Sequence, residues 1–370
     1  MRELRRLALV YPFDLKANAA IRLRLEAQVR EFANMASEVR VFAADRDTEC
    51  RATLSPELLA LTETVRCAGP KVLRVLAESR GLAARCHAWK PDLVLLRYAL
   101  PLPAFIRMAA QHPVVLEVHS DDIIEARSRG LGAKEVVRIL RRPLLGRAKA
   151  GVFVTEELRD SPRFDHLNGP RLALPNGVAL PAMVLQAPTN HRPRVGLLIG
   201  QAAPWHGIDL FCEMARRRRD IEWTLIAPAG RIPGNADRTV VEVVNTATEL
   251  EYVQALGTLD LGLGSLAMSR VGLAESASLK VRDLVAYGIP VALFSKDPDL
   301  HRANDRCVRR FDEPIADPAK VADQVAEFAK ACQGTRISNS TRSKVDVTAK
   351  ARQYAAFLSN VATSAMAYAT

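Results

Sequence analysis

The sequence has few aromatic residues and no cysteine pair with metal-binding spacing. Only 5% of its 370 residues are Phe, Trp or Tyr, which argues against the stacking surfaces that bind single-stranded nucleic acid. Six cysteines are scattered along the chain, and no two have the C-x-x-C spacing of a zinc or redox site. We therefore expect reduced thiols in a cytoplasmic protein, without a zinc site or a disulfide framework.

Long apolar runs are also missing. No segment approaches the roughly 18 apolar residues that span a bilayer, and Asp14 interrupts the apolar start too early for a signal peptide. We interpret this first apolar run as a buried strand.

The net charge of +11 is concentrated in the N-terminal half. Residues 1–180 contain 29 basic and 21 acidic side chains, against 23 and 20 in the remainder. A basic half attracts nucleic acid, anionic lipid or a phosphorylated substrate, and charge alone does not choose among them.

Apolar segments of strand length alternate with amphipathic segments of helix length. The predicted strands are 5–11, 39–43, 92–98, 113–118, 151–155, 194–199, 222–227, 259–265 and 290–295. The predicted helices are 18–35, 55–63, 71–88, 102–111, 121–148, 207–219, 247–256, 318–332 and 343–362. This alternation predicts an α/β protein with doubly wound parallel sheets.

A proline-rich segment divides the pattern into two halves. We expect an N-terminal domain over 1–180, a linker over 181–193, a C-terminal domain over 194–342, and a last helix within 343–370 that can cross back to the first domain. Ligands of open α/β folds bind at the carboxyl ends of the strands, so we expect a cleft there between the two sheets.

The segment 275–291, ESASLKVRDLVAYGIPV, carries the clearest chemical signal. It predicts a helix entry at Ser278 and Leu279, where free N–H groups suit a phosphate and Lys280 adds a full positive charge. Glu275 and Asp283 are placed to accept hydrogen bonds from hydroxyls. Groups that donate hydrogen bonds to a phosphate thus lie beside groups that accept hydrogen bonds from hydroxyls. This combination favours a nucleotide-sugar site.

A second signal is the loop Gly200-Gln-Ala-Ala-Pro-Trp-His-Gly207, which joins a strand to a helix. Gly200 permits a sharp turn, the Gly207 N–H is expected to face a phosphate, and Trp205 and His206 are expected to project into the cleft. The alternative is a tight strand–helix loop with an incidental tryptophan.

These two segments together resemble the donor domain of GT-B fold retaining glycosyltransferases of family 4. That family commonly has EASPLKVFEYMAAGLPV, and here the two acids are Glu275 and Asp283, with Asp in place of the second Glu. In the first loop the family often has Lys at the position of His206, and Trp-His-Gly is a recognisable variant of that loop. Asn176-Gly177-Val178 is similar to the family's PNGV. The resemblance implies two Rossmann-like domains that face a cleft, across nearly the whole chain.

The resemblance also implies residue roles. Glu275 would contact hydroxyls of the donor sugar, Asp283 would hold the ribose, and Ser278, Leu279 and Lys280 would bind the diphosphate. The reaction would transfer a sugar from a nucleoside-diphosphate sugar to a hydroxyl of a saccharide, glycolipid or lipid-linked acceptor, with retention, without a metal and without a cofactor. With His206 in place of Lys, we expect activity to fall above neutral pH if a protonated His206 supplies the second cation.

Two residues of the first half are further candidates. His119 follows a strand where relatives often have a histidine near the donor sugar; alternatively it makes ordinary hydrogen bonds at the strand end. Arg22 lies early in the first helix, where relatives have a glycine-rich loop that this chain lacks. It is a candidate contact to acceptor or phosphate, or else a solvated helix residue.

Two patterns have weaker implications. Asp45-Arg-Asp47 and Asp297-Pro-Asp299 match the D-x-D of metal-dependent enzymes, but so short a pattern arises often by chance, and we expect no metal site. Residues 134–149 (KEVVRILRRPLLGRAK) are basic and amphipathic. They suit either an anionic membrane at the inner face of the cell, on which lipid-linked acceptors lie, or an ordinary helix packed on the first sheet.

Two other functions stay open from the sequence. One is a GT-B fold sugar-nucleotide epimerase, which would have the same two domains. The other is a basic nucleic-acid-binding protein, although the low aromatic content and the paired acids count against it, so we expect no nucleic-acid partner.

Overall fold

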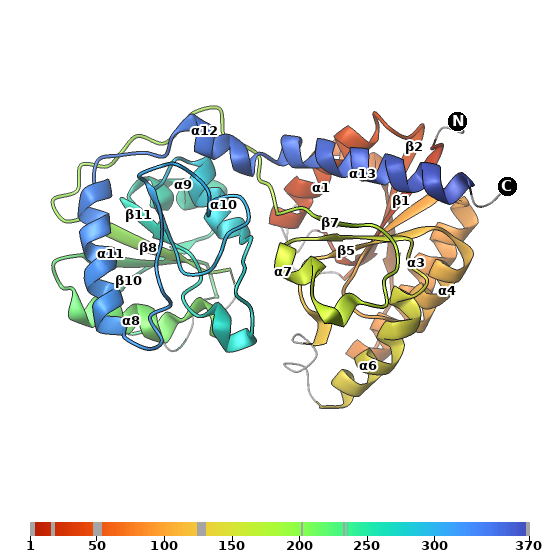
Figure 1. The fold of residues 1–370 in the computed structure, drawn as a ribbon, viewed down its shortest axis with the longest axis horizontal. Coiled ribbons are helices and arrows are strands. Elements are labelled where there is room, and N and C mark those ends of the chain that lie inside the picture. The colour runs from red at the N-terminus through yellow and green to blue at the C-terminus, as the bar shows by residue number, and fades with distance from the viewer. Residues whose placement is uncertain are drawn as a thin grey trace. The chain divides into compact units, whose positions relative to one another are not determined.

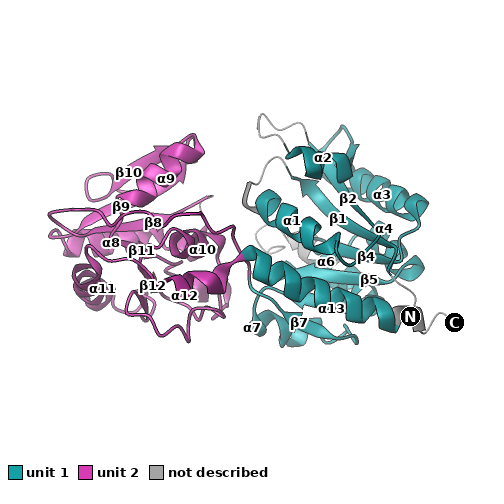
Figure 2. Ribbon diagram, turned by 90° about the horizontal axis from the view of Figure 1, so that it is seen from above, with its two compact units in different colours: residues 1–175, 347–370 teal, residues 176–346 magenta. Residues whose placement is uncertain are grey.

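The chain forms two compact units, which Figure 2 colours separately. Unit 1 comprises residues 1–175 and 347–370, and unit 2 comprises residues 176–346. The computed structural model describes residues 4–15, 19–46, 54–123, 131–200, 203–231, 234 and 236–367. Each unit has its own parallel sheet and its own apolar core, so the predicted α/β class with two doubly wound sheets is confirmed.

Unit 1 is built on a parallel sheet with the strand order β3-β2-β1-β4-β5-β6-β7. The central strands are nearly continuous runs of buried apolar residues, as expected where helices cover both faces of a sheet. The strands are β1 (Arg6–Asp14), β2 (Glu38–Asp45), β3 (Thr62–Arg66), β4 (Leu93–Arg97), β5 (Val114–Val118), β6 (Ala150–Phe153) and β7 (Arg171–Ala173).

The helices of unit 1 include the last helix of the chain. Figure 1 shows α13 lying along α1, and the rings of Phe32 and Tyr354 meet edge to face at 5.4 Å between centroids. The helices are α1 (Ala19–Phe32), α2 (Pro56–Leu61), α3 (Lys71–Trp89), α4 (Pro103–Gln111), α6 (Leu131–Leu145), α7 (Glu156–Arg159) and α13 (Val347–Ala367). No helix among the described residues is long and apolar enough to cross a bilayer.

Unit 2 repeats the architecture with the strand order β10-β9-β8-β11-β12-β13. Its strands are β8 (Arg194–Leu198), β9 (Glu222–Pro228), β10 (Glu242–Thr246), β11 (Leu261–Leu263), β12 (Val291–Leu293) and β13 (Val308–Arg310). Its helices are α8 (Ile208–Arg217), α9 (Glu249–Gly257), α10 (Leu279–Ala286), α11 (Pro318–Cys332) and α12 (Asn339–Arg342). In both units the core consists of buried apolar residues of the strands and helices, as the apolar pattern of the sequence predicted.

The segment 181–193, which we expected to be a linker, packs onto unit 2. The Arg336 guanidinium donates to the carbonyls of Leu185 (3.0 Å) and Gln186 (2.6 Å), and Arg342 donates to Pro181 O (3.1 Å). These arginines satisfy the carbonyls of an irregular segment that has few backbone partners of its own. The segment is therefore a fixed part of unit 2.

Candidate functional site

The signature segment lies at the carboxyl edge of the unit 2 sheet. Ser276 N donates to Lys296 O (2.9 Å) and Lys296 N donates to Ala274 O (2.9 Å), so the strand-like residues before α10 pair with the chain that leaves β12. Helix α10 then starts at Leu279, with Ser278 as the residue before its first turn. Leu284, Val285 and Ile289 are fully buried, as predicted. This packing fixes the position of the helix entry.

Lys280 and His206 meet at this helix entry. Lys280 Nζ lies 3.0 Å from His206 Nε2, and the Lys280 side chain also runs beside Gly200, where a Cβ would lie 3.8 Å from Lys280 Cε. An ammonium group has only donors, so a charged Lys280 donates to Nε2 of a neutral His206. That a protonated His206 supplies a second cation stays a prediction, because one proton lies between the two nitrogens in either arrangement.

Burial lowers the pKa of Lys280 to about 8, although Asp283 acts in the opposite direction. Burial likewise raises the pKa of Asp283 to about 6, against the opposing effects of the Tyr252 hydrogen bond and of Lys280. The Tyr252 hydroxyl donates to Asp283 Oδ2 at 3.1 Å. At neutral pH the site therefore holds an ammonium group and a carboxylate. Burial destabilises both charges, and hydrogen bonds or opposite charges of a bound ligand would stabilise them.

Glu275 is buried, and its Oε1 lies 2.5 Å from Nζ of Lys296. Lys296 is about one-third exposed at its side chain. The sequence predicts that Glu275 contacts hydroxyls and does not indicate Lys296, which lies 21 residues further along the chain. The pair places a second ammonium group beside the signature segment.

The Trp205–Gly207 loop is pinned to the chain after β11. Ala267 N donates to Trp205 O (3.1 Å) and Leu266 N donates to His206 O (3.4 Å). Gly207 has φ +65°, and a Cβ there would lie 2.8 Å from the Cβ of Leu266, so only glycine fits. Its N–H donates to Pro204 O at 3.3 Å. The Gly207 amide therefore forms a hydrogen bond within the turn, whereas the sequence predicted that it would face a phosphate.

Asp297 and Asp299 bind a buried arginine. Asp297 contacts the Arg282 guanidinium with both carboxylate oxygens, and Asp299 Oδ2 lies 3.0 Å from Arg282 Nη2. Arg282 is completely buried and also donates to Asn176 O at 3.1 Å. Asn176 in turn donates to Ala277 O at 2.9 Å. This D-x-D therefore stabilises the segment that precedes α10; the other pattern includes Asp47, which lies outside the described residues.

His119 lies in unit 1, directly after β5, in a buried network at the carboxyl edge of that sheet. Its Nε2 is 3.4 Å from Glu117 Oε1, and Arg24 Nη1 is 3.1 Å from each ring nitrogen. Glu117 also contacts Arg97 Nη1 at 3.3 Å. Arg22 lies on α1, two residues before Arg24. It is partly buried, and its Nη1 has no hydrogen-bond partner among the described residues.

Helix α6 contains much of the basic segment 134–149. Val137, Leu144 and Leu145 are buried against unit 1, whereas Ile139 is 67% exposed and its neighbours Arg138 and Arg142 face solvent. Most of the apolar face is thus used for packing, which favours the ordinary helix of the two readings. An exposed strip of basic side chains with one isoleucine remains.

Comparisons with known proteins now apply to this geometry. Residues 20–177 match the family described as "Glycosyl transferase 4-like domain". Within unit 1, the chain is therefore similar to a glycosyltransferase 4-like domain. No curated protein matches the sequence, so the remaining likeness is structural.

Solved structures with a similar fold cover both units of the chain. HepE of Anabaena, in complex with UDP-glucose, has a TM-score of 0.64 and 15% identity over 96% of this chain and 99% of its own. Sucrose-phosphate synthase of Thermosynechococcus elongatus has a TM-score of 0.65 and 15% identity, covering 97% and 100%. The lipopolysaccharide outer core galactosyltransferase WaaB, in its apo form, has a TM-score of 0.63 and 10% identity, covering 96% and 99%. At these identities the likeness establishes the GT-B fold.

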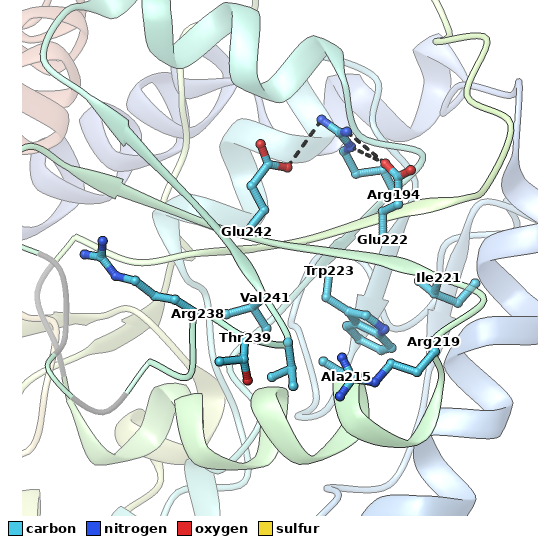
Figure 3. Close-up of a pocket in the computed structure, with 11 residues that line it drawn as sticks. Arg194, Ala215, Arg219, Ile221, Glu222, Trp223, Arg238, Thr239, Val241 and Glu242 are labelled. Carbon is cyan, nitrogen blue, oxygen red and sulfur yellow. Dashed lines mark hydrogen bonds and ion pairs between the residues drawn. The ribbon is translucent and has the colours of Figure 1, made fainter.

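A separate pocket of about 340 Å³ lies on unit 2, at the amino ends of β8, β9 and β10 (Figure 3). Arg194 spans its rim, paired with Glu222 at 2.8 Å and Glu242 at 3.6 Å, and Trp223 lies among the lining side chains. Arg194, Glu222 and Glu242 begin β8, β9 and β10, whereas Gly200 follows the other end of β8 and lies beside the Lys280 side chain. The pocket is therefore distinct from the candidate donor site.

Proposed function

We propose that this enzyme transfers a sugar from a nucleoside-diphosphate sugar to a hydroxyl of a saccharide, glycolipid or lipid-linked acceptor, with retention of configuration and without a metal. The observation that carries the donor assignment is the arrangement at the entry of α10. Lys280 and Asp283 lie on α10 and interact electrostatically, and Glu275 lies in the segment directly before this helix, where it pairs with Lys296. HepE, whose fold is similar, is a complex with UDP-glucose.

In this proposal the diphosphate lies against Lys280 and the amides of Ser278 and Leu279. The ammonium and the helix N-terminus both favour negative charge, and both are in place before the leaving phosphate gains it. Asp283 accepts from the ribose hydroxyls and Glu275 from the sugar. Trp205, which is 38% exposed, offers a ring beside His206.

Metal independence is supported by two positive features. Lys280 supplies charge that a divalent ion would otherwise bring to the diphosphate. The carboxylates of the described D-x-D, Asp297 and Asp299, are committed to Arg282. Retention is supported by the family resemblance of the 275–291 segment. His119 is proposed to serve the reaction from unit 1, and Arg22 to contact acceptor or phosphate.

We further propose that the enzyme works at the inner face of the cell membrane, in the synthesis of a cell-surface polysaccharide or glycoconjugate. The support is the exposed face of α6, where Arg138, Ile139 and Arg142 lie together. Basic side chains near an anionic surface gain about 1 kcal/mol each. Binding to vesicles containing 30% anionic lipid, compared with neutral vesicles, tests this; R138E/R142E is expected to abolish the difference. Equal binding by the variant would contradict it.

The transfer itself is tested with a panel of nucleotide sugars and saccharide or lipid-linked acceptors. We expect a product enlarged by one sugar, released nucleoside diphosphate, and unchanged turnover with a chelator present. An epimerase would return an altered nucleotide sugar without needing an acceptor. A nucleic-acid-binding protein would show no turnover, and its affinity for DNA or RNA would depend strongly on salt.

A further inference from the structure

Glu117 carries a buried negative charge in the middle of an apolar strand. It is 1% exposed and lies on β5 between Leu116 and Val118. Its Oε1 lies 3.5 Å from Arg24 Nη2 and 3.4 Å from Gln28 Nε2, and its Oε2 accepts from Tyr11 at 3.3 Å and Arg97 at 3.3 Å. A carboxylate in such a place is retained only when it is well paired, and it orients the groups that pair with it.

We propose that Glu117 is a positioning residue that fixes the His119 ring in its neutral form, with the proton on Nε2 and with Nδ1 left to accept a hydrogen bond from a substrate hydroxyl. This inference rests on the proposed function, in which His119 contacts substrate. It assigns to Glu117, Arg24 and Arg97 a role that the family motif does not carry.

The tautomer follows from the contact between the two residues. His119 Nε2 lies 3.4 Å from Glu117 Oε1, and a carboxylate accepts only, so the ring proton lies on Nε2. The partner of one ring nitrogen thereby decides the state of the other, and Nδ1 keeps its lone pair.

Arg24 acts on the ring from a different direction. Its Nη1 is equally distant, at 3.1 Å, from both ring nitrogens. An N–H group in the ring plane cannot approach both nitrogens so closely without colliding with the carbon between them, so the guanidinium lies over the ring face. Arginine stacks in this manner on flat rings. The in-plane lone pair of Nδ1 is therefore not taken up by Arg24.

The charges around the ring keep it neutral. The surrounding groups come from every packed element: Arg24 and Gln28 from α1, Arg97 from β4, Tyr11 from β1, and Tyr354 from α13. Burial, Arg97 and Arg24 hold the pKa of His119 well below its ordinary value, and Glu117 only partly opposes them. Burial raises the pKa of Glu117, but Arg24, Arg97 and His119 outweigh it and hold that pKa well below its ordinary value. A protonated His119 would put three cations around one carboxylate.

The consequence for chemistry is a restriction. A ring that stays neutral through the physiological range does not donate a proton to a leaving group. His119 instead accepts a hydrogen bond from a substrate hydroxyl through Nδ1, which suits orientation of a sugar. Its side chain is 16% exposed, so a ligand can reach it.

The test is NMR of the full-length protein with ¹⁵N-labelled histidine, with His119 assigned from the signals missing in His119→Gln. We expect the Nε2–H tautomer, without titration between pH 5.5 and 8.5. An Nδ1–H tautomer, or a His119 signal that titrates within that range, would overturn the proposal. The wild-type spectrum decides this even if substitutions at Glu117 impair folding.

Variants test the part played by Glu117. Glu117→Gln can donate as well as accept, so we expect a mixture of tautomers and a loss in kcat of about 10-fold, with KM changed much less, as for the loss of one orienting hydrogen bond. Glu63→Gln, which alters an exposed ion pair of the same unit, is the matched control. An Nε2–H ring and unchanged kcat in Glu117→Gln would contradict the inference.

The outcomes separate this inference from the proposed function. If His119 has the expected tautomer but His119→Gln retains full kcat, the substrate contact is wrong, and with it the purpose proposed for Glu117. If no nucleotide sugar binds at all, the donor assignment in unit 2 fails, whereas the state of the ring in unit 1 is measured independently.

Discussion

The Lys280 ammonium lies 3.0 Å from Nε2 of His206 and donates to it. The histidine ring thereby contacts the lysine side chain at the entry of α10. Because the pKa of Lys280 is lowered to about 8, the positive charge at the entry of α10 depends on the protonation of this side chain.

Nucleotide-sugar affinity is expected to fall as pH rises above about 8. Below that pH Lys280 is charged, and above it the phosphate loses a charge-assisted hydrogen bond, which is worth about 1.5–3 kcal/mol. Bound phosphate also favours the protonated form, so binding should take up protons near pH 8. Titration calorimetry from pH 6.5 to 9.5 in buffers of different ionisation enthalpy measures both effects.

Lys280→Arg is the control for this pH dependence, because the guanidinium stays charged throughout the range. Its affinity should lack the decline near pH 8, and any change that remains belongs to the ligand. A wild-type affinity that is level up to pH 9.5 would show that Lys280 does not bind the phosphate.

Ionised Asp283 is expected to cost folding stability. Its folded pKa is raised from 3.8 to about 6, so the folded state binds the proton more tightly, and stability is lost as pH rises through this window. Asp283→Asn should therefore raise the melting temperature of unit 2 by about 2–4 °C at pH 7 and by little at pH 4. It should also weaken nucleotide binding. Calorimetric melts at both pH values measure the difference; a lower melting temperature at pH 7 than in the wild type would contradict it.

Tyr252→Phe tests the hydroxyl that Asp283 accepts from. Without this donor the pKa of Asp283 should rise further above about 6, because Tyr252 now lowers it. Nucleotide affinity at pH 6.5 should then fall more than at pH 8. In the double variant Asp283→Asn/Tyr252→Phe, the loss of affinity should be the same at both pH values. An equal loss at both pH values in Tyr252→Phe alone would disprove the coupling between the two residues.

Arg282→Met is expected to destabilise the fold by about 3–5 kcal/mol, because Asp297 and Asp299 would remain buried without their cation. Arg310→Met, on the exposed side of β13, should change stability by less than about 0.5 kcal/mol. Urea unfolding compares the two variants. Similar midpoints would mean that the D-x-D carboxylates are not held by Arg282.

The sequence predicted the central strands, the long helices and the signature helix, because each has a strong apolar period. It missed β3, β7, β10 and β13, which form the edges of the two sheets, where few residues need to be apolar. Part of the predicted helix 121–148 falls on residues 124–130, which lie outside the described residues.

Among site residues, the motif spacing placed Lys280 and Asp283 on one helix, where they interact electrostatically, whereas Glu275 pairs with Lys296. It did not identify Lys296 or Tyr252, since their contacts depend on how separate elements meet in three dimensions. The sequence does contain an indication of the Arg24–Glu117 pair. Glu117 is a charged residue inside the apolar strand VVLEV, and such a residue requires a buried partner.

The most direct test is thermal stabilisation of the protein by a panel of nucleotide sugars, because a ligand that binds the folded state at 100 times its Kd adds about 2.7 kcal/mol. We predict that one donor raises the melting temperature of the wild type and of Lys320→Ala, an exposed lysine of the same unit. Lys280→Ala should lose most of the shift, and Glu275→Ala should abolish it. If no nucleotide sugar stabilises the wild type, or if Lys280→Ala and Glu275→Ala respond as the wild type does, the donor site is not where we place it.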